Sequence, residues 1–106
     1  MNYISAKELS ERLNSGETIQ IIDVRECDEQ EICAIEGNHH IPMGDIIERH
    51  GEIRTDIPVV VHCKSGQRST AVVLSLQSKF GFPNLLNLNG GIMAWADEVD
   101  QSMEKY

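Results

Sequence analysis

One short segment of the sequence, residues 63–68 (CKSGQR), combines a nucleophile with two cations. The reactive form of a cysteine is the thiolate, which nearby positive charges stabilise. Lys64 and Arg68 supply two such charges beside Cys63, although the chain as a whole has 17 Asp and Glu against 9 Lys and Arg and a net charge of −8. This local reversal of sign predicts that Cys63 acts as a nucleophile toward a small anion.

The flanking sequence places Cys63 at the junction of a strand and a helix. Residues 57–62 (IPVVVH) are mostly β-branched and apolar, which is the strongest strand signal in the chain. Residues 69–80 predict an amphipathic helix that ends at Gly81. A cysteine at such a junction faces the unpaired amides and the positive dipole end of the helix. The apolar stripe of this helix consists of Val72, Val73, Leu76 and Phe80.

The segment after Cys63 is expected to form an anion cradle around one sulfur atom. Gly66 allows backbone conformations that a side chain would block, so successive amides can point inward, and Arg68 adds a cation at the rim. Lys64 is expected to attract the anion by its charge. The other polar residues either contribute amides or a hydroxyl or are simply solvated, and they rank below Cys63 and Arg68. They are Ser65, Gln67 and Ser69.

The rest of the chain predicts an α/β domain with a mostly parallel central sheet and helices on both faces. Strands that alternate with helices favour this class, because parallel strands need crossover connections. Ligands of such sheets bind at the carboxyl ends of the strands, where residues 63–68 are predicted to lie. The remaining helices are predicted at residues 5–16, 26–33, 45–50 and 92–98, and the remaining strands at 18–24, 37–42 and 85–88.

Composition limits the class of protein. With 41% hydrophobic and 25% charged residues, the 106 residues predict a single globular domain, 1–106, with one core. An odd number of cysteines and the lack of a leader segment predict a cytoplasmic protein. No apolar run is long enough to cross a membrane. The acidic balance disfavours binding to nucleic acid or to anionic lipid.

Four segments distributed along the chain form a recognisable series: residues 22–25 (IDVR), 36–42 (EGNHHIP), the loop 63–68, and 87–95 (NLNGGIMAW). In this order they resemble the rhodanese family, and the resemblance extends over nearly the whole chain. The middle and final segments resemble motifs shared by catalytic and non-catalytic rhodanese modules, so they imply the three-layer rhodanese fold. The cysteine loop is the part that argues for activity.

The resemblance implies that sulfur is carried as a persulfide on Cys63. The thiolate would attack the outer sulfur of a donor such as thiosulfate, sulfite would leave, and a second nucleophile would collect the sulfur. The loop amides and Arg68 would stabilise the charges, with no cofactor. Lys64 stands where the family often has arginine, so attraction remains without bidentate recognition. Residues 90–106 resemble rhodanese domains attached to enzymes that adenylate ubiquitin-like sulfur carriers, which implies a sulfur-donor or sulfur-acceptor protein partner.

Three alternatives remain for the loop. Cys63 could be a buried structural cysteine, although a Ser-Gly-x-Arg-Ser neighbourhood offers no apolar reason for one. The domain could be a rhodanese-fold interaction module without chemistry, which would commonly have replaced the cysteine. Phosphatases and arsenate reductases on this fold resemble C-x5-R, whereas Cys63 and Arg68 are spaced as C-x4-R, which is cramped for a phosphoryl group.

Other residues with reactive side chains are assigned structural roles. Asp23 and Arg25 either reach the active loop or pair with each other to fix a turn, and the second role is favoured, as support for the site. His62 is expected to face away from Cys63, since side chains alternate along a strand. No metal site is predicted, because the spacing C-x5-C-x5-H-H at residues 27–40 lacks the short pairs of zinc modules. A redox disulfide from Cys63 to either other cysteine has no support from spacing.

Overall fold

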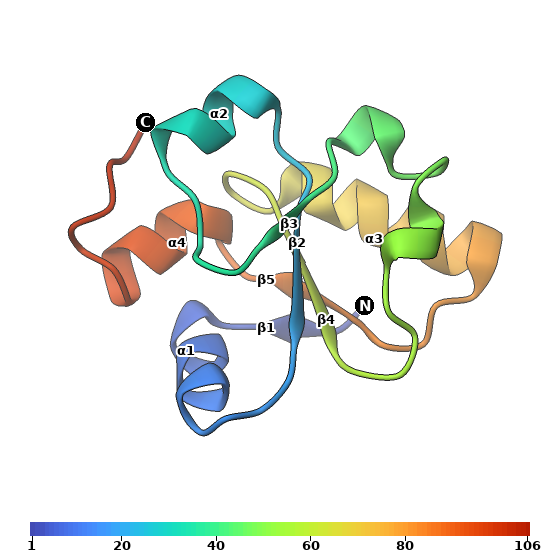
Figure 1. Cartoon of the computed structure of the whole chain (residues 1–106), viewed down its shortest axis with the longest axis horizontal. Coiled ribbons are helices and arrows are strands. Elements are labelled where there is room, and N and C mark those ends of the chain that lie inside the picture. Colours follow the sequence, from blue (N-terminus) through green and yellow to red (C-terminus); the bar gives the residue numbers. More distant parts are fainter.

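The computed structural model describes residues 1–106 and contains one sheet of five parallel strands in the order β1-β5-β4-β2-β3 (Figure 1). The predicted α/β class with a parallel sheet is therefore confirmed. The strands are β1 (Tyr3–Ile4), β2 (Gln20–Asp23), β3 (His39–His40), β4 (Val59–His62) and β5 (Leu85–Leu88). The helices are α1 (Ala6–Asn14), α2 (Cys27–Ile32), α3 (Gln67–Phe80) and α4 (Gly91–Glu98). None of them has the length and apolar character needed to cross a membrane.

Helices cover both faces of the sheet, as predicted. On one face α1 and α4 lie side by side, and their residues Leu9, Ile92 and Trp95 pack with Val60 of the central strand. On the other face α3 packs on β4 and β5. The short helix α2 lies above the carboxyl end of β2 (Figure 1). That end of the sheet is where the cysteine loop begins.

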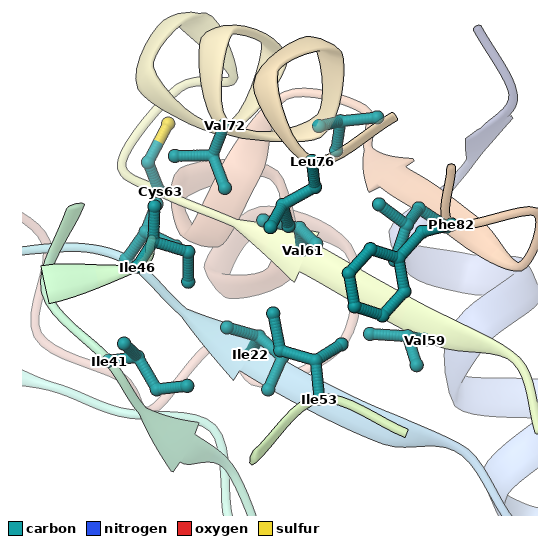
Figure 2. Close-up of a cluster of buried hydrophobic side chains, with 13 residues drawn as sticks. Ile22, Ile41, Ile46, Ile53, Val59, Val61, Cys63, Val72, Leu76 and Phe82 are labelled. Atoms are coloured by element: carbon teal, nitrogen blue, oxygen red, sulfur yellow. The ribbon is translucent and has the colours of Figure 1, made fainter. Parts of the chain in front are cut away.

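Strand β4 is buried along its whole length because it lies in the middle of the sheet. Its valines alternate between the two apolar clusters, with Val59 and Val61 on the α3 face and Val60 on the other. By the same alternation Cys63 lies on the α3 face and His62 on the opposite one, as predicted. Figure 2 shows Cys63 at one end of the α3-side cluster, next to Val72.

Helix α1 begins with a hydrogen-bonded N-cap at Ser5. The amide of Glu8 donates a hydrogen bond to Ser5 Oγ at 3.0 Å, which satisfies one of the unpaired donors at the helix start. The Glu8 carboxylate points along the helix instead of back to Ser5, and lies 3.9 Å from Arg12. Ala6 and Leu9 of this helix are fully buried.

The local structure differs from the sequence predictions at three places. The helix expected at residues 45–50 is wrong: the segment forms two 3-10 turns, Met43–Asp45 and His50–Glu52, because a stretch bounded by glycines is too short to nucleate an α-helix. Strand β1 was missed, since two residues carry no periodicity. Phe80 is 40% exposed and stacks on His50 at 3.8 Å between ring centroids, so the buried stripe of α3 ends at Leu76.

The stripe of α3 can be tested with a matched pair of leucines. Leu76 is fully buried on the sheet side of α3, whereas Leu74 on the same helix is 53% exposed. We expect Leu76→Ala to lower the free energy of unfolding by about 2–5 kcal/mol, and Leu74→Ala to change it by less than about 0.5 kcal/mol. Urea denaturation measures both, and equal losses for the two variants would contradict this packing.

Candidate active site

The turn between β4 and α3 wraps its backbone around the sulfur of Cys63. The amide of Gly66 donates to Cys63 Sγ at 3.1 Å and that of Ser69 donates at 3.4 Å, while Ser69 Oγ lies 3.5 Å from the same sulfur. Gly66 has φ = 113°, a left-handed conformation that a side chain strongly disfavours, and this value turns its amide inward. The cradle expected from the sequence is thus present, and it is made of neutral donors.

These donors set the ionisation of Cys63. Burial favours the neutral thiol, but hydrogen bonds from the Ser69 side chain and from the amides of Ser69, Gly66 and Ser65 favour the thiolate. The second effect is larger, so the pKa of Cys63 is lowered below that of an ordinary thiol. At neutral pH a larger fraction of Cys63 is therefore in the nucleophilic form.

A buried asparagine on β5 holds the first turn of α3 and was missed by the sequence reasoning. Asn87 accepts from Ser69 Oγ at 2.6 Å and donates to Thr70 Oγ1 at 2.8 Å, and only 2% of its surface is exposed. A hydroxyl has a single proton, so Ser69 donates either to Asn87 or to a Cys63 thiolate. The signal was a polar residue within the apolar strand sequence LLNL.

The start of α4 fixes the backbone of the loop from the other side. The amide of Ile92 donates to the carbonyl of Cys63 at 2.9 Å, and the amide of Met93 donates to the carbonyl of Lys64 at 3.1 Å. Because a trans peptide points its C=O and N–H in opposite directions, the Lys64 carbonyl bond turns the Ser65 amide toward the sulfur. A Cβ at Gly91 would lie 2.4 Å from the Lys64 carbonyl oxygen, so only glycine permits this approach.

Arg68 does not stand at the rim as a free cation. Its guanidinium makes a two-pronged ion pair with Glu29 of α2, with Nη1 to Oε1 at 2.6 Å and Nη2 to Oε2 at 2.8 Å. The hydrogen bonds from Arg68, aided by the hydroxyl of Tyr106 at 2.7 Å, lower the pKa of Glu29 to about 2. The charge that the sequence analysis assigned to the rim of the cradle is therefore balanced by Glu29, and a role of Arg68 in binding the donor remains a prediction.

Lys64 also has a partner that the sequence did not reveal. Its ammonium lies 4.5 Å from the centre of the Tyr106 ring, over the face of the aromatic system. Among the other predicted loop residues, Ser65 and Gln67 are exposed at the end of the turn. Tyr106 and Glu29 are far from the loop in sequence, and neither belongs to a recognisable pattern.

Asp23 at the end of β2 and Arg25 two residues later pair with each other, and both are fully buried. Arg25 also donates to the carbonyl oxygens of Glu29 at 3.2 Å and of Cys33 at 2.7 Å. These bonds tie α2 to the end of β2. Burial opposes ionisation of Asp23, but the hydrogen bonds and charge of Arg25 together with the charge of His62 outweigh it and lower the pKa of the carboxyl. The favoured structural pairing is the arrangement found, while its importance for activity is a prediction.

The other reactive side chains do not join the loop. All three cysteines are free thiols, with Cys27 exposed and Cys33 buried 3.8 Å from Arg25 Nη1. The chain brings no three His, Cys, Asp or Glu side chains into a metal-binding group. Its three surface hollows are lined by other residues, and Cys63 is only 1% exposed. A donor therefore has to displace part of the loop's surroundings to reach the sulfur.

Comparisons with known proteins agree on one family. A family model for the rhodanese-like domain matches residues 5–98. The chain is 38% identical to a sulfurtransferase of Allochromatium vinosum, covering 91% of this chain and 89% of that protein. It is 37% identical to the adenylyltransferase/sulfurtransferase MoeZ of Mycobacterium tuberculosis, covering 97% of this chain but only 26% of MoeZ. A solved rhodanese-like domain protein from Staphylococcus aureus superposes with a TM-score of 0.85 at 30% identity, covering 100% and 99% of the two chains.

The contribution of Ser69 to the thiolate can be measured directly. Because Ser69→Ala removes a hydrogen bond to the charged sulfur, we expect the pKa of Cys63 to rise by about one unit. The thiolate exists above the pKa, so the pH profile for alkylation of Cys63 by iodoacetamide, followed by mass spectrometry, should move to higher pH. The control Ser78→Ala, on the exposed side of α3, should leave it in place. An unshifted profile for Ser69→Ala would contradict the assignment.

The close approach of α4 predicts a large effect at Gly91. A methyl group there meets the backbone of the loop and also has to adopt φ = 61°, so Gly91→Ala should lower the free energy of unfolding by about 2–4 kcal/mol. Alkylation of Cys63 should slow as the loop loses its shape. The control is Gly44→Ala, where nothing lies within 4 Å of the added carbon. Similar unfolding curves for the two variants would refute the argument.

Proposed function

Because this chain belongs to the rhodanese-like domain family, we propose that it is a sulfurtransferase that carries sulfane sulfur as a persulfide on Cys63. The observation that supports this most strongly is the sulfur of Cys63 held by backbone amides at the start of α3. Relatives that are named sulfurtransferases support the transferase activity in general. The donor, the persulfide and the acceptor are our proposal.

In the first half-reaction, the Cys63 thiolate attacks the outer sulfur of a donor such as thiosulfate or a protein persulfide. With thiosulfate, a bond forms between Cys63 Sγ and the outer sulfur, the bond to the sulfonate sulfur breaks, and sulfite leaves with the electron pair. Sulfite is a stable anion, so the step needs no general acid. The lowered pKa of Cys63 supplies the thiolate that this attack requires.

In the second half-reaction, a thiophilic acceptor attacks the terminal sulfur and the thiolate of Cys63 leaves. The terminal sulfur of the persulfide is negatively charged in the interval between the two steps. Amides of Ser65, Gly66 and Ser69 that already bind Cys63 are suited to stabilise this charge, because they are preorganised and point at the sulfur. The same amide donors would therefore stabilise both the thiolate and the persulfide of Cys63.

Two alternatives are less well supported. A phosphatase or arsenate reductase needs its arginine to hold the oxyanion, whereas Arg68 is engaged by Glu29 and the spacing to Cys63 is one residue short. A purely binding module has no use for a thiol whose pKa is lowered by a cradle of donors. Both observations favour sulfur transfer.

The cellular compartment and the protein partner are also part of the proposal. We place the protein in the cytoplasm, with a sulfur-donor or sulfur-acceptor protein as its partner. MoeZ is named for adenylyl transfer as well as sulfur transfer, which is consistent with a route in which sulfur passes to an activated carrier protein. Since this chain spans about a quarter of MoeZ, the adenylating activity is not assigned to it.

The function is tested by following one sulfur atom. The purified protein is incubated with thiosulfate or with a protein persulfide and measured by intact mass spectrometry, and cyanide is then added while thiocyanate is assayed. We expect a gain of one sulfur atom that cyanide removes. Cys63→Ser should show no gain, because it lacks the nucleophile.

The matched control is Cys27→Ser, since Cys27 is an exposed thiol outside the loop. It should load and discharge like the unmodified protein. A folded protein with reduced Cys63 that gains no sulfur from either donor would refute the proposal. Equal loading of the Cys63→Ser variant would show that the sulfur resides on another residue.

A further inference from the structure

Each cation near the cysteine loop is already engaged by another group of the same chain. Arg68 is paired with Glu29, and Arg25 is paired with Asp23. The ammonium of Lys64 rests on the ring of Tyr106. The positive charge that the sequence places around Cys63 is therefore largely balanced or covered in the folded protein.

Tyr106 connects these partners. Its hydroxyl donates to Glu29 Oε2 at 2.7 Å and accepts from Arg25 Nη1 at 3.1 Å, while its ring faces the Lys64 ammonium. The residue is half-buried beyond the end of α4. It thus covers one loop cation with its ring and, with its hydroxyl, helps to hold the counterion of another, Arg68.

This arrangement affects donors according to their charge. The attacking group is itself an anion, so a doubly charged donor meets twice the repulsion that a singly charged one meets at the same distance. A free cation at the loop would offset that repulsion, and the net charge of −8 on the chain adds to it. Neutral amides bind sulfur well but cancel no net charge.

We propose that Tyr106 is a specificity-determining residue: by covering Lys64 and supporting the Glu29–Arg68 pair, it makes the site take sulfur from singly charged donors in preference to the thiosulfate dianion. Cysteine persulfides are the natural class of such donors. This inference rests on the proposed function and selects among its donors.

With a singly charged persulfide, R–S–S⁻, the step balances without further reagents. The Cys63 thiolate attacks the outer sulfur, the original S–S bond breaks, and R–S⁻ leaves with the electron pair. The outer sulfur keeps its negative charge and becomes the terminal sulfur on Cys63. One thiolate is consumed and one is released, so the transfer requires neither an oxidant nor a reductant.

The test compares two donors that differ by one charge and otherwise have similar chemistry. Thiosulfate is doubly charged, and methanethiosulfonate, in which a methyl group replaces one oxygen, is singly charged. The rate of persulfide formation on Cys63 is measured for each by mass spectrometry, and their ratio gives the charge preference. We expect the unmodified protein to load more slowly from thiosulfate than from methanethiosulfonate or cysteine persulfide.

Removing the ring should shift this ratio. In Tyr106→Ala the Lys64 ammonium becomes available to the donor, so the thiosulfate-to-methanethiosulfonate ratio should rise roughly two- to fivefold. Tyr106→Phe keeps the ring over Lys64, so its thiosulfate-to-methanethiosulfonate ratio should stay close to that of the unmodified protein. Tyr3→Ala removes an exposed tyrosine of β1 and should leave the ratio unchanged. Glu29→Gln keeps the shape of the side chain but releases the charge of Arg68, and should raise the ratio independently of Tyr106.

The outcomes separate the inference from the function on which it rests. If both donors load Cys63 but the ratio is the same in Tyr106→Ala, Glu29→Gln and the unmodified protein, the role of Tyr106 is refuted and the sulfurtransferase function stands. Preference of the unmodified protein for thiosulfate would refute the inference in the same way. If no donor loads Cys63 in any variant, the proposed function fails together with the inference.

Discussion

The geometry of the site depends on the contact between the first turn of α4 and the carbonyl groups of Cys63 and Lys64. The Lys64 carbonyl faces α4, so the Ser65 amide of the same peptide group faces the sulfur. Gly91 is what allows the two backbones to approach so closely. Helix α4 is in turn held by Ile92 and Trp95, which pack into the core beside α1. The cradle is thus a consequence of helix packing as much as of the loop sequence.

A second chain of contacts controls the charges around the loop. Asp23 neutralises the buried Arg25, Arg25 holds α2, and α2 presents Glu29 to Arg68. A buried ion pair contributes little net stability because of its desolvation cost, yet removing one member would leave an unpaired charge. The Asp23–Arg25 pair therefore matters chiefly because it positions the carboxylate of Glu29 beside Arg68.

The chemistry that results depends on dipoles more than on net charge. The thiolate of Cys63 is stabilised by amides and a hydroxyl that are already oriented, in a site that water hardly reaches. Such donors bind a single sulfur atom well whether it belongs to a thiolate or to a persulfide. They do not attract a dianion from a distance, so in our proposal the state of Lys64 and Arg68 decides what kind of donor approaches.

The α/β class, the parallel sheet and the loop that carries Cys63 could be predicted from the sequence, because apolar periodicity and glycine positions are local properties of the chain. The sequence also placed Gly66 correctly at the turn. Which charges are free could not be predicted, since Glu29 and Tyr106 reach the loop through contacts between residues far apart in sequence. The partners of Asn87 were likewise invisible. Local patterns predict elements, whereas the electrostatics of a site depend on which side chains the packing of those elements brings together.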